Sequence, residues 1–141
     1  MATKPVDKQS AAVYLKRFKE YSDVIRFLED EPEKYGDTLA LLAVHSAISL
    51  GDAILVACTG RRSIDQDHRE SLRLLRDLCH ARRVPDDGLK QYDRLIERKT
   101  DISYGERWLY IEGVVKRARL QAVRFAFWAQ KNFRKELDQW Q

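Results

Sequence analysis

The stretch LALLAVHSAISLGDAILVACTG, residues 39–60, decides the fold of this chain. A helix over these residues is apolar on nearly every side, so we expect it to be surrounded by other helices. Its apolar part, Leu39 to Cys58, approaches the length of a membrane span. Polar residues interrupt that part, which favours a buried core helix and no association with a membrane; they are His45, Ser46, Ser49, Gly51 and Asp52.

Helical periodicity extends to both sides of this core helix. Residues 6–28 repeat apolar positions at helical spacing and stop before Glu31-Pro32, as proline requires. The core helix itself is expected to begin with Asp37 as its cap and to end near Gly60. After a break at residues 84–88, a further helix is carried by Leu89, Tyr92, Leu95 and Ile96.

Two capping boxes predict where the remaining helices begin. In Ser63-Ile64-Asp65-Gln66 and in Ser103-Tyr104-Gly105-Glu106, a serine caps the helix and the residue three positions later reaches back. We therefore expect the third helix to begin at Ser63 and the fifth at Ser103. The apolar stripe of the fifth helix comprises Trp108, Ile111, Val115, Ala118, Ala122, Phe125 and Ala129.

These elements predict an all-α fold in one domain over residues 1–141, an up-and-down bundle of four core helices plus one additional helix. No segment shows the alternation of a strand. Short connections predict antiparallel neighbours, which would place Cys79 about 21 Å from Cys58 along the third helix. We therefore expect two small buried thiols without a disulfide.

The composition of the chain indicates which kinds of partner, cellular location and cofactor to expect. The net charge of +4 favours an anionic partner, such as a nucleic acid, a nucleotide or an acidic protein. The N-terminus lacks the apolar region of a signal peptide and the cysteines form no disulfide framework, so we expect a cytoplasmic protein. Phosphate loops, familiar nucleophile motifs and metal-ligand spacings are absent, and we expect neither a metal nor a cofactor.

The segment GRRSIDQDHRES, residues 60–71, contains candidate anion-binding and catalytic residues. Arg61 and Arg62 precede the expected cap of the third helix, where backbone N–H groups and the helix dipole favour an anion. The apolar stripe places His68 about one turn into that helix, where it would act as a general base, a metal ligand or a buried hydrogen-bond partner. His45 and Asp52 share a face of the core helix, so a structural Asp52–His68 hydrogen bond is the alternative to chemistry.

A basic stripe marks the last helix. Residues 113–135 contain no acid, and Arg117, Arg124 and Lys131 recur every seven residues. Such a stripe suits a nucleic-acid backbone, although a solvated face near a helix C-terminus has the same composition. Four aromatic residues near the C-terminus exceed what one helix face can bury and indicate a homodimer; they are Phe127, Trp128, Phe133 and Trp140.

Taken in order, LLAVHSAISLGDAILVACTGRRSIDQDHRESLRLLRDL, RLIERKTDISYGE and the long last helix resemble the HEPN family, the higher eukaryotes and prokaryotes nucleotide-binding domain. The chain looks most like its small stand-alone bacterial members, over about residues 10–130. The resemblance implies a helical bundle that often dimerises, in a family of metal-independent ribonucleases of toxin–antitoxin and defence systems and of non-catalytic members.

Active members carry an arginine and a histidine a few residues apart, and Arg62 and His68 have that spacing. The resemblance puts the motif near the last core helix, however, where this chain reads Arg98-Lys99-Thr100-Asp101-Ile102-Ser103-Tyr104 and Ser103 replaces the histidine.

Three functional hypotheses follow. The first is a non-catalytic dimeric module that binds RNA, another nucleic acid or an acidic protein through Arg61, Arg62, Lys99 and the basic stripe. The second is a metal-independent endoribonuclease in which His68 moves a proton and Arg62 stabilises the phosphorane. The third is a regulatory or structural interaction subunit.

Overall fold

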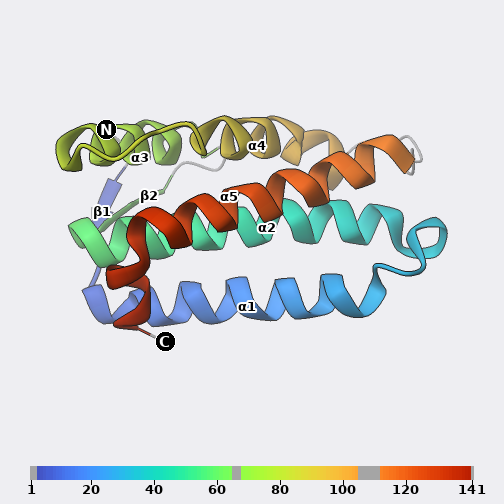
Figure 1. The fold of residues 1–141 in the computed structure, drawn as a ribbon, viewed down its shortest axis with the longest axis horizontal. Coiled ribbons are helices and arrows are strands. Elements are labelled where there is room, and N and C mark those ends of the chain that lie inside the picture. Colours follow the sequence, from blue (N-terminus) through green and yellow to red (C-terminus); the bar gives the residue numbers. More distant parts are fainter. Residues whose placement is uncertain (1–2, 65–67, 105–111, 141) are drawn as a thin grey trace.

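The computed structural model describes residues 3–64, 68–104 and 112–140, which form five α-helices, a 3₁₀ turn at Lys8–Ser10 and one two-stranded sheet (Figure 1). The predicted all-α class is confirmed. The helices are α1 (Ala11–Leu28), α2 (Pro32–Thr59), α3 (Arg69–Arg82), α4 (Leu89–Tyr104) and α5 (Glu112–Asp138), and the strands are β1 (Thr3–Pro5) and β2 (Arg61–Ser63).

Helix α2 is the centre of the bundle, as predicted. Every residue from Ser46 to Val56 is buried. The helix has the length and apolar composition of a membrane span, but 83% of its most apolar window is buried inside the molecule. Its C-terminus is capped by Gly60, which has a φ of 67° and donates its N–H to the carbonyl of Val56.

The start of α2 differs from the prediction. The helix begins at Pro32, and its backbone is kinked at Tyr35, which has a φ of −121°. Asp37 therefore lies inside the helix and is not its cap. Proline is favoured in the first helical turn because its missing N–H would have no partner there, which explains the earlier start.

Two close approaches fix α4 and α5 against their neighbours. A Cβ atom on Gly51 would lie 2.8 Å from the ring of Tyr92, so glycine lets α4 approach α2. Gly88, just before α4, is closer still, since a Cβ there would lie 2.1 Å from Trp128 of α5. The ring of Phe125 continues this packing, with its centroid 5.2 Å from that of Tyr92.

The sheet corrects the predicted start of the third helix. β1 and β2 are antiparallel, with Thr3 opposite Ser63 and Pro5 opposite Arg61. Ser63 is thus a buried strand residue, and α3 begins only at Arg69. The capping prediction for Ser63 is wrong because pairing with the N-terminal segment overrides the local signal. Asp65 and Gln66 of the predicted box lie outside the described residues.

The predicted start of the last helix is also wrong. Ser103 lies in the last turn of α4, and α5 begins, within the described residues, at Glu112. Trp108 and Ile111 of the predicted stripe lie outside those residues. The rest of the stripe is confirmed as buried: Val115, Ala118, Ala122, Phe125 and Ala129.

The path of the chain between α2 and α3 differs from the antiparallel prediction. Leu75 of α3 lies beside Gly51 of α2, and further along both helices the charge of Arg82 acts on Cys58. The two helices therefore run in the same direction, as Figure 1 also shows. Both cysteines are free, and the spacing of about 21 Å predicted from antiparallel packing does not apply.

Candidate functional surface

Arg62 points from β2 into the bundle. Its Nη1 donates a hydrogen bond to the hydroxyl of Tyr14 on α1 at 2.7 Å, and its Nη2 lies 3.9 Å from a carboxylate oxygen of Asp52 on α2. The guanidinium also lies over the Tyr14 ring, 5.1 Å from the centroid. The side chains of Arg62 and Asp52 are 25% and 6% exposed. Arg62, which the sequence predicted to be catalytic, therefore links β2 to α1 and α2.

The Asp52 carboxyl has a perturbed proton affinity. Burial raises its pKa to about 6, and the charges of Arg62 and Arg17 oppose that rise. A carboxyl of this kind is half-protonated close to the lower end of the physiological range. The buried cluster is thus a structural ion pair whose charge depends on pH.

His68 is placed differently from the prediction. It is the N-cap residue of α3, with a left-handed φ of 61°, and not a residue one turn into the helix. Its Nε2 lies 3.4 Å from the ammonium nitrogen of Lys99 on α4. The expected Asp52–His68 hydrogen bond is wrong, since Asp52 contacts Arg62 instead. Arg62 thus contacts Tyr14 and Asp52, whereas His68 contacts Lys99.

His45 lies near the same lysine. Burial lowers the pKa of His45, and the charge of Lys99 lowers it further. Its ring also packs against Tyr21, with centroids 6.1 Å apart. His45, His68 and Lys99, which are separated in the sequence, therefore gather between α2 and the ends of α3 and α4.

Arg61, the other arginine of the GRRS segment, is exposed on β2. Its guanidinium donates to the Thr3 hydroxyl at 2.9 Å. Since α3 starts eight residues later, the predicted anion site at a helix N-terminus does not form around Arg61 and Arg62.

The predicted basic stripe lies on the surface. Arg117, Arg124 and Lys131 are all exposed on α5, and Lys116 is exposed beside them. Within the described residues none of these four cations has an ion pair with a carboxylate. Within that part of the chain, Arg117 donates a hydrogen bond to the carbonyl of Gly113 at 3.1 Å.

The cationic surface extends from α5 to the neighbouring helix. Burial lowers the pKa of Arg98 on α4, and the charges of Arg117 and Arg94 lower it further. Arg94, Arg98 and Arg117 therefore lie near one another where α4 lies against α5, and the charge of Glu97 opposes their effect on the pKa of Arg98.

Apolar residues share the exposed face of α5. Val123 and Phe127 are 65% and 73% exposed, although both are large and hydrophobic. Of the four aromatic residues expected to exceed one buried face, Trp128 and Phe133 are buried and Phe127 is on the surface. We name the exposed residues Lys116, Arg117, Val123, Arg124, Phe127 and Lys131 the α5 face.

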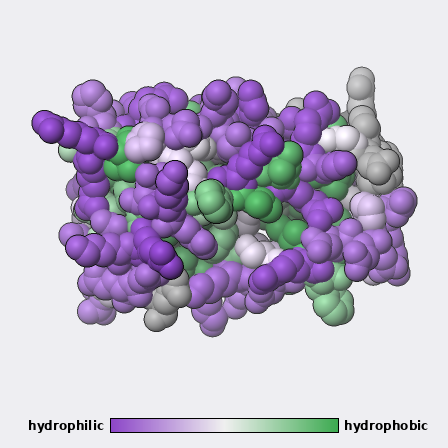
Figure 2. Space-filling model, viewed as in Figure 1, coloured by the Kyte–Doolittle hydropathy of each residue, from purple (hydrophilic) through white to green (hydrophobic). Residues whose placement is uncertain are grey.

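Sequence reasoning missed the depression beside this face. The surface between α1 and α5 is hollowed, with apolar side chains in the hollow and hydrophilic ones around it (Figure 2). Lys19 and Ser22 of α1 line it although neither belongs to a sequence motif. Periodicity reports which face of one helix is apolar, but not that two helices far apart in the sequence leave a gap.

Neither the protein-family models nor the curated proteins searched with this chain give a match. Within residues 3–64, 68–104 and 112–140, no group of three or more His, Cys, Asp or Glu side chains is arranged to hold a metal ion.

Proposed function

We propose that this chain is a non-catalytic helical interaction module that binds an anionic macromolecule through the α5 face. The observation that carries the proposal is the row of exposed cations at Lys116, Arg117, Arg124 and Lys131, which have no carboxylate partner in the described structure. Charges that are not neutralised within a protein attract polyanions over a distance set by the ionic strength. The resemblance to non-catalytic HEPN members agrees with this assignment.

The proposal is tested by charge reversal on α5. Fluorescein-labelled polyglutamate and a labelled single-stranded RNA are titrated with the protein at about 50 mM salt, where electrostatic binding is strongest. The double variant Arg117→Glu/Arg124→Glu is expected to bind about tenfold more weakly than wild type, a loss of about 1.4 kcal/mol.

The matched control is Arg76→Glu/Lys90→Glu, which reverses two exposed cations on α3 and α4. It changes the net charge equally and should bind within about twofold of the wild type, because screening confines the effect to nearby charges. Equal losses in both variants, or no binding of either probe by wild type, would contradict the proposal.

A metal-independent endoribonuclease is the second candidate, and the contact between His68 and Lys99 favours it. A histidine moves the proton in such a reaction, while a neighbouring cation stabilises the phosphorane. Lys99 takes that second role here, because Arg62 is engaged by Tyr14 and Asp52.

Structured RNA incubated with the protein and a chelator tests this candidate. Cleavage that both His68→Ala and Lys99→Ala abolish would establish it. RNA that stays intact, or cleavage that His68→Ala leaves unchanged, would eliminate it.

A further inference from the structure

A groove runs along the bundle between α1 and α5. It consists of two successive hollows of about 520 Å³ and about 490 Å³. The first begins at Leu15 of α1 and lies beside the bent end of α5, and the second ends at Glu29. Those two residues are 14 positions apart, which corresponds to about 21 Å of helix. The groove therefore has the length of a helix of four turns.

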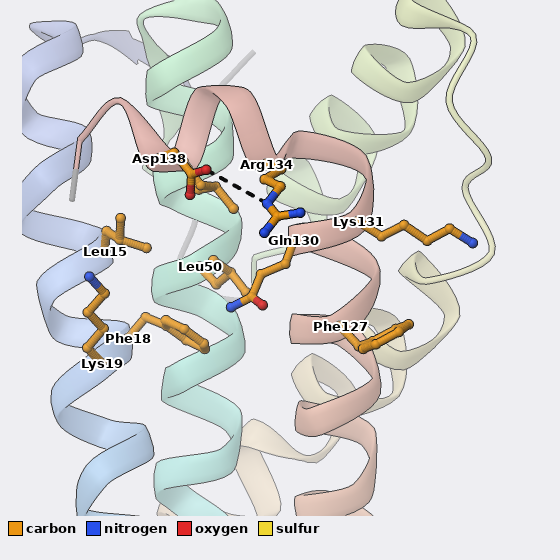
Figure 3. Close-up of a pocket in the computed structure, with 10 residues that line it drawn as sticks. Leu15, Phe18, Lys19, Leu50, Phe127, Gln130, Lys131, Arg134 and Asp138 are labelled. Atoms are coloured by element: carbon orange, nitrogen blue, oxygen red, sulfur yellow. Dashed lines mark ion pairs between the residues drawn. The ribbon is translucent and has the colours of Figure 1, made fainter.

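Apolar side chains line part of the groove, together with polar ones such as Gln130 of α5. Leu50 of α2 forms the floor of the first hollow, and Leu15 and Phe18 of α1 flank it (Figure 3). Ile25 of α1 and Val123 of α5 are among the residues that line the second hollow. Such a surface gains free energy when another apolar surface covers it.

The two walls carry an excess of positive charge. Six cations and two carboxylates line the hollows. Arg119 is neutralised by Glu29 at 2.6 Å, and Arg134 lies 3.8 Å from Asp138. Within the described residues, no carboxylate pairs with Lys19 of α1 or with Lys116 and Lys131 of α5.

Figure 3 shows how these charges are disposed. Lys19 comes from α1, whereas Lys131 and Phe127 reach outward from α5, away from α1. Both of these α5 side chains also line a neighbouring hollow of about 380 Å³ beside Gly88. In the first hollow Lys19 and Lys131 therefore lie on opposite sides of Leu50, and the Gln130 side chain lies beside that leucine (Figure 3).

An apolar floor between cationic walls fits one kind of ligand better than the others. A nucleic-acid backbone would satisfy the cations but would leave the apolar floor in contact with water. A second copy of this chain would bring its own cationic α5 face against these lysines. An amphipathic helix with acidic flanks matches both features, because such a helix places apolar residues at i, i+3, i+4 and i+7 on one side and carboxylates beside them.

We propose that the groove between α1 and α5 binds an acidic amphipathic helix of a partner protein, about 14 residues long. This inference rests on the proposed function and deepens it by naming the class of anionic macromolecule. The helix lies between the two walls, with its apolar side on Leu50 and its carboxylates facing Lys19 and Lys116.

The test uses three synthetic peptides and fluorescence anisotropy at about 50 mM salt. The first peptide is an amphipathic helix with leucines at i, i+3, i+4 and i+7 and glutamates flanking them. The second contains the same residues in an order that destroys the apolar face. The third is a copy of the first with lysine in place of glutamate. Wild-type protein should bind the first at least about tenfold more tightly than either of the others, and its circular dichroism should show helix formation on binding.

Two variants locate the site, each with a matched control. Val123→Glu changes an exposed residue in the groove and should weaken binding of the first peptide about tenfold, whereas Phe27→Glu changes a residue that is 86% exposed and does not line it. Lys19→Glu should also weaken binding, and Lys90→Glu on α4 should not. Because all four positions are exposed, the variants should fold, which circular dichroism checks.

The possible outcomes separate this inference from the proposed function. If the second peptide binds as tightly as the first, or if RNA binds and neither acidic peptide does, the groove proposal falls while the anion-binding function stands. If no acidic peptide, polyglutamate or RNA binds at low salt, both fall. If Val123→Glu converts a dimer into a monomer in sedimentation, the groove is a dimer interface and the proposal is overturned.

Discussion

Asp52 is the residue on which the buried polar cluster depends. It sits on the most apolar helix of the chain, yet it faces Arg62 and lies near Arg17. The sequence indicated that Asp52 needs a buried partner, but it suggested His68. The true partner could not be predicted, because it depends on β2 pairing with the N-terminal strand and on the direction of α3.

The raised pKa of Asp52 gives a pH-dependent stability. Its pKa rises from 3.8 in the unfolded chain to about 6 in the folded one, so between these values the folded state holds a proton that the unfolded state has released. The contribution of the Asp52 carboxyl to the free energy of unfolding is therefore fully present below pH 3.8 and is lost as the pH rises through about 6. Over this range wild type should lose about 3 kcal/mol of unfolding free energy relative to Asp52→Asn.

Urea unfolding of both proteins at a series of pH values measures this difference. The subtraction removes the contributions of all other titrating groups. Parallel curves for the two proteins, or a wild type that gains stability over the same interval, would show that the Asp52 carboxyl is not held in a desolvated site.

The adjacent arginines should differ sharply in their effect on stability. Arg62→Met removes the cation beside a buried carboxylate and should lower the free energy of unfolding by about 3 kcal/mol near neutral pH. Arg61→Met removes only an exposed hydrogen bond to Thr3 and should cost at most about 0.5 kcal/mol. Chemical denaturation compares the two, and equal costs would refute the structural role of Arg62.

At the level of the helices and strands, periodicity predicted the elements well and their starts less well. The buried positions of α2, α4 and the described part of α5 follow the predicted stripes, and Gly60 ends α2 as expected. The two capping boxes failed for different reasons. Ser63 is engaged in a strand, and Ser103 is part of the helix that precedes the expected start. A capping box reports only a local preference, which a partner sixty residues away can override.

Gly88 tests the packing of α4 against α5. An added methyl group would lie 2.1 Å from Cγ and 2.6 Å from Cβ of Trp128, and the Trp128 indole is itself held by a hydrogen bond to the Pro85 carbonyl. Gly88→Ala should therefore destabilise the protein by about 1–3 kcal/mol, the usual cost of overpacking.

The control for this prediction is Gly113→Ala. Among the described residues the nearest atom to a methyl group there is Arg117 Nη2 at 3.9 Å, so the substitution adds a better helix former without a clash with any of them. Thermal melts should show a lower Tm for Gly88→Ala and an unchanged or higher one for Gly113→Ala. Equal melting temperatures for Gly88→Ala and wild type would mean that the approach to Trp128 is not tight.

At the level of the whole molecule, the sequence predicted the basic stripe on α5 but not the groove that lies beside it. The basic stripe was predicted from the seven-residue spacing of Arg117, Arg124 and Lys131, and their exposure is confirmed. The groove beside it was not predicted, because α1 and α5 are separated by about 90 residues of chain. The stripe and the groove adjoin only in the folded bundle, where α2 forms a floor between α1 and α5.

The measurement that tests the central claim most directly is a map of backbone amide shifts by nuclear magnetic resonance. Labelled protein is titrated with polyglutamate at low salt, and its mass of 16.6 kDa suits the experiment. The account predicts shifts concentrated on the α5 face, around Arg117, Arg124 and Lys131, which fade as salt is added. Shifts confined to Arg61 and His68, or a spectrum that polyglutamate leaves unchanged, would contradict the assignment of binding to α5.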